Sequence, residues 1–263
     1  KHDNYNEIEH LNEIPFSTFE GIDRTRYDVT STLPILMSRG CIRQCSFCSE
    51  RLLYKGFRIR SAEYVVQEIE FHMKHNKVTS FVFHDSLING ELRTLEQFCD
   101  QVFERGLSIS WEAQCSIRND MDVRILEKMK QAGCFNLFIG LESASNTVLQ
   151  RMSKGMTRDD ARTFFEKCNK VGLHFEISLI TNFPGETEDE FHETCDFIRE
   201  HKGIIPKIAQ VNPYVPYAGT EIGDAYPVVD EAQGQERMQK LVILFEEEEI
   251  PYTKSYIGNL LPA

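Results

Sequence analysis

The sequence lacks the patterns that mark several common classes of protein. No apolar run in its 263 residues approaches the roughly 20 residues that span a membrane, and no secretory signal peptide is recognisable. Basic residues are scarce, 29 against 41 acidic ones, and the formal charge of −12 argues against nucleic acid as a partner. A Gly-x-Gly-x-x-Gly fingerprint, a Gly-Lys-Ser/Thr phosphate loop and a His-Glu-x-x-His helix are absent. The hydrophobic content of 41% predicts a globular protein with a substantial core.

The eight cysteines do not resemble the framework of a small disulfide-bonded secreted protein. Five are scattered singly through predicted helices and strands. We predict that these are small buried hydrophobic residues: Cys99, Cys115, Cys134, Cys168 and Cys195. Free thiols favour a reducing compartment, so we predict a cytoplasmic protein.

The other three cysteines, Cys41, Cys45 and Cys48, lie within the segment SRGCIRQCSFC with the spacing Cys-x3-Cys-x2-Cys. Three thiolates on one short loop can bind three irons of an iron–sulfur cube. A structural zinc site or cluster normally has a fourth protein ligand nearby, which is missing here. The fourth iron would therefore be open to a substrate or cofactor.

Basic residues gather around this loop although the protein as a whole is acidic. Between positions 39 and 60 there is one acidic residue, Glu50, and there are six basic ones: Arg39, Arg43, Arg51, Lys55, Arg58 and Arg60. These charges offset those of thiolates and sulfides, or they form a docking face for an acidic electron donor or an anionic substrate.

Segments of strand and helix character alternate along the chain. Strands are expected at 33–39, 80–84, 108–114, 135–140, 174–181 and 208–214, and helices between them and at 230–249. This alternation predicts an α/β fold with a parallel sheet, either doubly wound or curled into a barrel. We expect a lead-in at 1–30, a core at 31–222 and a C-terminal helical extension at 223–263.

Function is expected at the carboxyl ends of the strands, where the connecting loops gather. The cysteine loop follows the first predicted strand there. His84 and Asp85 end the second predicted strand, Gln114 ends the third, and Glu142 follows the fourth.

Together these motifs resemble the radical S-adenosylmethionine superfamily, over about residues 14 to 225. The cysteine spacing and the aromatic Phe47 carry the first part of the resemblance. The rest is carried, in order, by Phe57-Arg-Ile-Arg-Ser61, Phe83-His84-Asp85-Ser86, Trp111…Arg118, Met129-x2-Ala132-Gly133-Cys134, Gly140-Leu-Glu142-Ser143, Met152-x-Lys154-Gly155-x-Thr157, Asn182-Phe-Pro184-Gly185-Glu186-Thr187 and Pro216-Tyr-Ala-Gly219-Thr220.

The resemblance implies a partial (β/α)6 barrel like that of a TIM barrel and an anaerobic enzyme. Cys41, Cys45 and Cys48 would bind a 4Fe–4S cluster that reductively cleaves S-adenosylmethionine to a 5′-deoxyadenosyl radical. That radical would take a hydrogen atom from a small-molecule or peptide substrate, with an electron donor such as flavodoxin or ferredoxin. The implied cofactor contacts are Phe47 for the adenine, Asp85 for the ammonium, Glu142 for the ribose hydroxyls or the ammonium, Gln114 as a further candidate, and Ser143 and Arg158 for the carboxylate. Tyr214 and Tyr217 face the substrate or pack in the core.

The lead-in is similar to the linker of the branch that carries a cobalamin-binding domain before the radical domain. Its Asp-x-His-x-x-Gly signature is absent from this sequence. Three explanations follow. The chain, which starts at Lys1, is part of a longer protein, or cobalamin binds to another chain, or this protein works without cobalamin. With cobalamin the transferase would methylate or rearrange an unactivated carbon. The alternatives are cobalamin-independent methylthiolation or ring formation, and a non-catalytic iron–sulfur or zinc protein.

Overall fold

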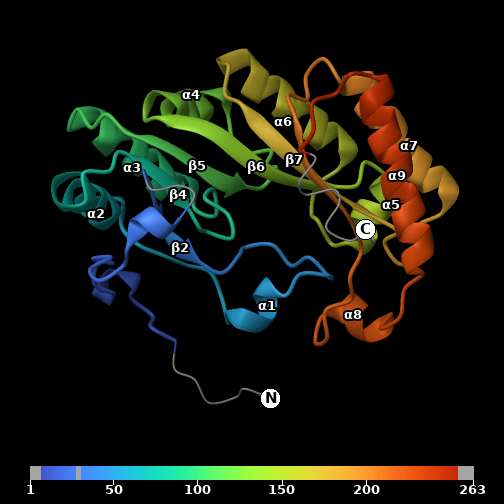
Figure 1. Cartoon of the computed structure of the whole chain (residues 1–263), viewed down its shortest axis with the longest axis horizontal. Coiled ribbons are helices and arrows are strands. Elements are labelled where there is room, and N and C mark those ends of the chain that lie inside the picture. The colour runs from blue at the N-terminus through green and yellow to red at the C-terminus, as the bar shows by residue number, and fades with distance from the viewer. Residues whose placement is uncertain (1–6, 28–30, 254–263) are drawn as a thin grey trace.

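The computed structural model describes residues 7–27 and 31–253 and is built around one six-stranded sheet (Figure 1). All paired strands in it are parallel, in the order β1-β4-β5-β6-β7-β8. Because this order follows the chain without reversal, the sheet is a partial barrel and not a doubly wound sheet. The predicted α/β fold with a partial (β/α)6 barrel is confirmed. The strands are β1 (Thr32–Ile35), β4 (Ser80–Phe83), β5 (Ser110–Cys115), β6 (Cys134–Glu142), β7 (Phe175–Thr181) and β8 (Ile208–Pro213).

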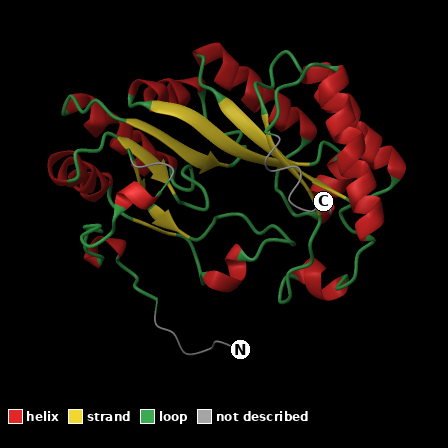
Figure 2. Ribbon diagram, in the orientation of Figure 1, coloured by secondary structure: helices red, strands yellow, loops and turns green. Residues whose placement is uncertain are grey.

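Helices connect successive strands and cover the outer face of the curved sheet (Figure 2). The long ones are α2 (Ala62–His75), α3 (Leu92–Glu104), α4 (Val123–Gln131), α6 (Arg158–Val171), α7 (Glu188–His201) and α9 (Glu231–Glu247). Three short helices, α1 (Glu50–Leu53), α5 (Asn146–Arg151) and α8 (Glu221–Ala225), lie in connections after strands.

Local capping explains why the long helices begin where they do. The Ser61 hydroxyl accepts a hydrogen bond from the backbone N–H of Tyr64 and starts α2. Thr157 and Thr187 start α6 and α7 with reciprocal capping boxes. These polar residues stand directly before amphipathic segments, so the helix starts could be predicted from sequence.

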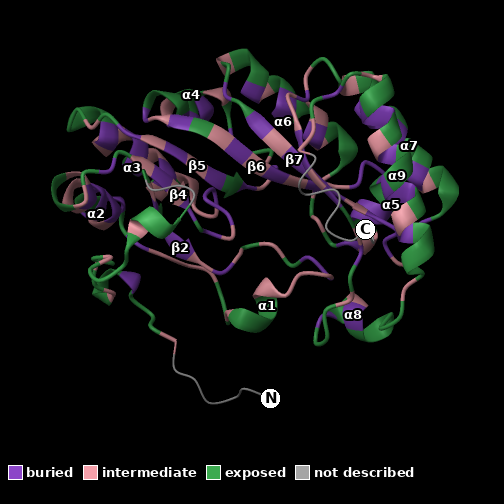
Figure 3. Cartoon of the chain, viewed as in Figure 1, coloured by how far each residue is buried: buried purple, intermediate pink, exposed green. Residues whose placement is uncertain are grey.

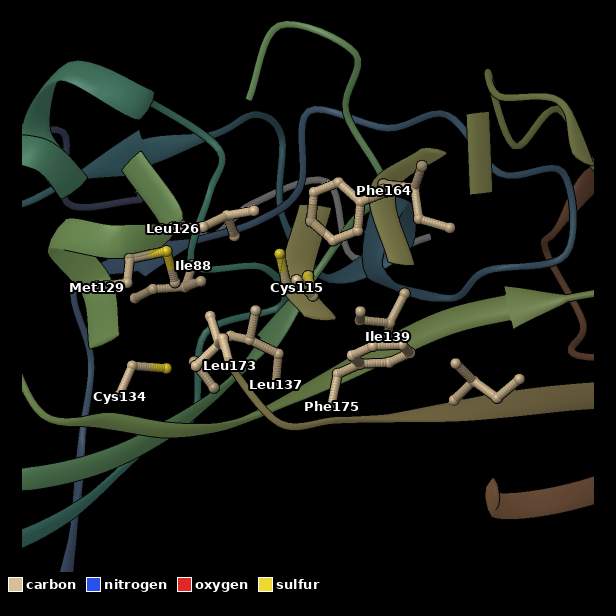
Figure 4. Close-up of a cluster of buried hydrophobic side chains, with 14 of the residues drawn as sticks. Ile88, Cys115, Leu126, Met129, Cys134, Leu137, Ile139, Phe164, Leu173 and Phe175 are labelled. Atoms are coloured by element: carbon tan, nitrogen blue, oxygen red, sulfur yellow. The ribbon is translucent and has the colours of Figure 1, made fainter. Parts of the chain in front are cut away.

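The core lies between the sheet and its outer helices, as the alternation of buried residues along the strands shows (Figure 3). In β6, Leu137 and Ile139 point outward into the core, whereas Asn136, Phe138 and Glu142 line the inner face. Side chains from α4 and α6 fill the outer layer (Figure 4). All five scattered cysteines are buried free thiols, as predicted.

Several short elements were not predicted. The expected strand at 33–39 ends at Ile35, and the chain then turns away. Ser38–Arg39 forms β2, which pairs antiparallel with β3 (Arg58–Ile59). The helices α1 and α8 were also missed, since four or five residues carry too little periodicity to be recognised.

The described part of the lead-in, residues 7–27, packs on α2 and β3. It contains the short 3-10 helices η1 (Leu11–Glu13) and η2 (Arg24–Arg26). Phe16 lies against Tyr64, with 4.8 Å between ring centroids, and Glu7 pairs with Arg58.

Across the described part of the chain, no helix has the length and apolar character to cross a membrane.

Candidate active site

The three clustered cysteines lie on the loop between β2 and α1, beside the carboxyl ends of the barrel strands (Figure 1). Cys45 is buried, and Cys41 and Cys48 are half-buried. Burial, together with the neighbouring Cys45 and Cys48, raises the pKa of Cys41 to about 11. Burial also raises the pKa of the other two thiols. The thiols are thus close enough to repel one another as thiolates, and a cation or metal centre would relieve that repulsion.

The loop also offers groups that favour thiolate sulfur. The backbone N–H of Arg43 donates to Cys41 Sγ at 3.3 Å. The nearby backbone of Glu50 lowers the pKa of Cys48, and the charge of Lys154 lowers the pKa of Cys45. Such N–H donors and nearby cations commonly surround cluster ligands.

The donor set, three cysteine thiols on one loop, fits a 4Fe–4S cluster with one iron left open. Within 7–27 and 31–253, no three His, Cys, Asp or Glu side chains are close enough to bind one metal ion. In such a cluster each thiolate binds a different iron, so three side chains need not meet around one metal ion.

Contacts in the middle of the cysteine loop attach it to the barrel. The Arg43 guanidinium donates to the carbonyls of Ile117 (2.5 Å) and Gly155 (3.1 Å). Ser46 donates from its hydroxyl to Arg151 O (2.8 Å) and from its N–H to Met152 O (2.9 Å). The loop is therefore held by the segments that follow β5 and β6.

A cavity of about 850 Å³ occupies the inner face of the sheet next to this loop. This volume is within the range of small-molecule sites. Its wall combines aromatic and polar side chains from every strand of the six-stranded sheet except β1, together with the loop residue Phe47. Six residues considered above line it: Phe47, His84, Gln114, Glu142, Tyr214 and Tyr217.

Glu142 is the best-supported polar group at the mouth of the cavity. One carboxylate oxygen accepts from Lys154 Nζ at 3.1 Å, and the other accepts from the Ser178 hydroxyl at 3.1 Å. Lys154 Nζ also lies 6.0 Å from the centre of the Phe47 ring. Glu142, Lys154 and Phe47 thus form one cluster beside the cysteines.

A polar network lies deeper in the cavity. Asn136 donates from its amide to Glu112 (3.3 Å) and Glu176 (3.5 Å). Lys207 pairs with Glu176 at 3.1 Å. The inner wall therefore offers hydrogen-bonding groups well below the level of Glu142.

Three residues predicted to contact the cofactor do not line this cavity. Asp85 is 1% exposed, and its carboxylate accepts from Met37 and Ser38. Ser143 is fully buried and shares a hydrogen bond with Thr194 (3.1 Å). Arg158 is exposed at the start of α6. Phe47, Gln114 and Glu142 are brought together at the cavity, and Asp85, Ser143 and Arg158 are not.

Sequence reasoning missed the partners of Glu142. Lys154 stood within a motif used for the resemblance, but its distance of 12 residues from Glu142 gave no sign of an ion pair. Ser178 lies on the neighbouring strand β7, one register position from Glu142, and only the strand pairing brings it close.

The basic residues around the loop are largely engaged within the chain. Arg58 pairs with Glu7, Arg60 pairs with Glu68, and Arg43 binds backbone carbonyls. Arg39 and Arg51 have no acidic partner among the residues described. The accessible positive charge is thus smaller than the sequence indicated.

Comparison with known proteins places the site in a family. The protein-family model of the radical SAM superfamily matches residues 35–198. An uncharacterised methyltransferase of Pyrococcus horikoshii is 28% identical over 218 residues, 82% of this chain and 47% of that protein. The anaerobic magnesium-protoporphyrin IX monomethyl ester cyclase of Rubrivivax gelatinosus is 26% identical over 73% of this chain and 35% of its own.

Among solved structures, the radical S-adenosylmethionine methyltransferase TsrM from Kitasatospora setae, with cobalamin and a [4Fe-4S] cluster bound, superposes with a TM-score of 0.63. It is 18% identical, and the match covers 72% of this chain and 38% of that one. The likeness shows a shared fold.

The chain belongs to the radical SAM superfamily, whose enzymes use a 4Fe–4S cluster and S-adenosylmethionine. It spans about half or less of the length of the curated relatives described above.

Proposed function

We propose that this chain is the radical-forming domain of an enzyme that acts on a small molecule or peptide held in the barrel cavity. One observation carries the proposal. The cysteine loop, which supplies three ligands, lies beside a cavity of about 850 Å³ into which Glu142 and Phe47 project. A structural metal site would need neither the cavity nor the polar groups at its mouth.

In this proposal Cys41, Cys45 and Cys48 hold the cluster. When bound there, the cluster would supply the electron for reductive cleavage of S-adenosylmethionine and so for hydrogen-atom abstraction from the substrate. The remaining work belongs to the chain: it binds and orients the sulfonium compound and keeps water away from the reacting atoms.

Residues at the cavity mouth have the chemistry for this binding. The Glu142 carboxylate can accept from ribose hydroxyls or from an ammonium group, and Lys154 and Ser178 fix its orientation. The Phe47 ring offers a flat apolar surface for adenine. Gln114 adds an amide at the end of β5. The roles of Asp85, Ser143 and Arg158 as cofactor contacts stay predictions.

Methyl transfer with cobalamin is the reaction we propose first. A methyltransferase relative and the fold shared with a cobalamin-bound methyltransferase support it. The cyclase relative favours ring formation as the second candidate.

The electron would come from an acidic donor such as flavodoxin or ferredoxin. Arg39 and Arg51, near the cysteines and without acidic partners in the described chain, are the residues proposed to meet it.

The proposal is tested by anaerobic reconstitution with iron and sulfide. After reduction by dithionite, the protein should convert S-adenosylmethionine to 5′-deoxyadenosine, measured by chromatography and mass spectrometry. Cys41→Ala should lose the cluster's visible absorbance and the nucleoside product, whereas Cys195→Ala, at a buried cysteine on α7, should retain both. If the protein binds zinc stoichiometrically and forms no 5′-deoxyadenosine, the proposal that it is a radical-forming enzyme is wrong.

A further inference from the structure

Two consecutive residues after β4, Asp85 and Ser86, contact the chain on both sides of the three cysteines. The Asp85 carboxylate accepts from the backbone N–H of Met37 (3.0 Å) and from that of Ser38. It also accepts from the Ser38 hydroxyl at 2.5 Å. The Ser86 hydroxyl donates to the carboxylate of Glu50.

These contacts stand at the two ends of the cysteine loop. Ser38 lies three residues before Cys41, and Glu50 lies two residues after Cys48. Glu50 is linked to the site a second time, because its backbone lies close enough to the Cys48 thiol to lower the pKa of that thiol. Ser86 therefore reaches the third cysteine through a single intervening residue.

The chemistry of Asp85 suits a fixed support. Its carboxylate is 1% exposed, and both of its oxygens are already engaged by the loop. A buried carboxylate with donors on both oxygens forms strong charge-assisted bonds, and removal of the acceptor would leave buried N–H groups unsatisfied. Rotating Asp85 toward a ligand in the cavity would break these bonds.

We propose that Asp85 and Ser86 are positioning residues that clasp the two ends of the cysteine loop and set the spacing of its thiols. Fixing both ends removes conformational freedom from the loop before any cluster binds, so the thiols are preorganised. The importance of this spacing for catalysis rests on the proposed function, but the clasp itself belongs to the cluster-free chain.

The clasp is tested first in the cluster-free protein by hydrogen–deuterium exchange of peptides covering residues 37–53. Asp85→Asn keeps the side-chain shape but replaces one acceptor by an NH2 donor, which then faces the backbone N–H of Met37 or of Ser38. It should speed exchange of the Met37 and Ser38 amides about tenfold or more, because a charge-assisted bond is lost. Ser86→Ala should speed exchange around Glu50 by a smaller factor. Asp159→Asn, at an exposed carboxylate on α6, should leave the loop unchanged.

A second readout separates positioning of the thiols from general stability. The dithionite-reduced, reconstituted variants are examined by electron paramagnetic resonance before and after addition of S-adenosylmethionine. In Asp85→Asn and Ser86→Ala the cluster signal, or its response to S-adenosylmethionine, should differ from that of the wild type, and in Asp159→Asn it should not. If circular dichroism shows that Asp85→Asn is unfolded, the exchange and resonance measurements are made on Ser38→Ala and Ser86→Ala instead.

Wild-type loop exchange and wild-type signals in both Asp85→Asn and Ser86→Ala would overturn the clasp while leaving the proposed function intact. The converse outcome is also distinct. If the wild-type protein assembles no cluster but loop exchange responds to these substitutions, the proposed function fails and the clasp stands.

Discussion

Glu142 owes its position to the residue two places before it. The backbone of Glu142 has a φ of 67°, in the left-handed region. The register between β6 and β7 shifts between Gly140 and Glu142. The side chain folds back over Gly140. A Cβ built on Gly140 would lie 2.3 Å from Glu142 Oε1 and 3.0 Å from Lys154 Nζ. Only glycine leaves room for this ion pair.

Gly140→Ala should therefore displace the Glu142 carboxylate and weaken binding of S-adenosylmethionine to the cluster-loaded protein by about tenfold, the loss of one charge-assisted bond. Equilibrium dialysis would measure the dissociation constant. Gly203→Ala is the matched control, because a Cβ there meets nothing within 4 Å. Equal affinity in the two variants would remove Glu142 from the proposed cofactor site.

At the level of single residues, the sequence predicted strand-end positions better than side-chain partners. Phe47, Gln114 and Glu142 could be predicted at the cavity because loops gather at the carboxyl ends of parallel strands. Asp85 also ends a strand, but its side chain turns to the cysteine loop. That orientation depends on the chain bending after Ile35, which neither periodicity nor composition reports.

Among the elements, α9 is secured by one buried ion pair. Arg237 Nη1 lies 2.8 Å from Glu186 Oε2, and each side chain is 2% exposed. Glu186 also accepts from the backbone N–H of Asn182 at 2.8 Å. The Asn-Phe-Pro-Gly-Glu turn after β7, which helped to identify the family, thus anchors the C-terminal helix in this chain.

Arg237→Met should lower the free energy of unfolding by about 3–5 kcal/mol, because the buried Glu186 carboxylate loses its counter-charge. Urea denaturation would measure this loss. Lys240→Met is the control on the same helix; its ion pairs are exposed, and the expected loss is about 0–1 kcal/mol. A loss in Arg237→Met no larger than in Lys240→Met would show that the pair does not anchor α9.

The loss in Arg237→Met should also depend on pH. Burial raises the pKa of Glu186 to about 7 in the folded wild type, even with Arg237 lowering it. Without Arg237 the folded-state pKa rises further above the unfolded value, so the folded state is favoured by protonation. The destabilisation should therefore be larger at about pH 8 than at about pH 6. The same loss at both values would contradict this account.

Helix boundaries followed from sequence where a capping residue stood before an amphipathic segment. Helices were expected between the predicted strands, and α2 and α7 begin directly after such capping residues, Ser61 and Thr187. The helices α1 and α8 did not follow, since both depend on tertiary contacts. Leu52 of α1 approaches Gly219 before α8, and the Ile222 N–H of α8 donates to Ser46 O at 3.2 Å.

Over the whole molecule, the cysteine loop joins parts of the barrel that are distant in sequence. Ser46 alone is bonded to Arg151, Met152 and Ile222, so one residue links the loop to α5 and α8. Binding of a cluster to the cysteines should therefore also stabilise α5 and α8, which Ser46 links to the loop.

Removal of the cluster by a chelator should consequently open the loop before it unfolds the barrel. Arg51 and Lys55 are exposed near the third cysteine, and trypsin should cut after them roughly tenfold faster in the cluster-free protein, because bound ligands stabilise the closed form. Mass spectrometry of timed digests would measure both rates. Cleavage after Lys202, at the far end of α7, should be the same with and without the cluster. Equal rates after Arg51 in the two forms would show that ligation does not order the loop.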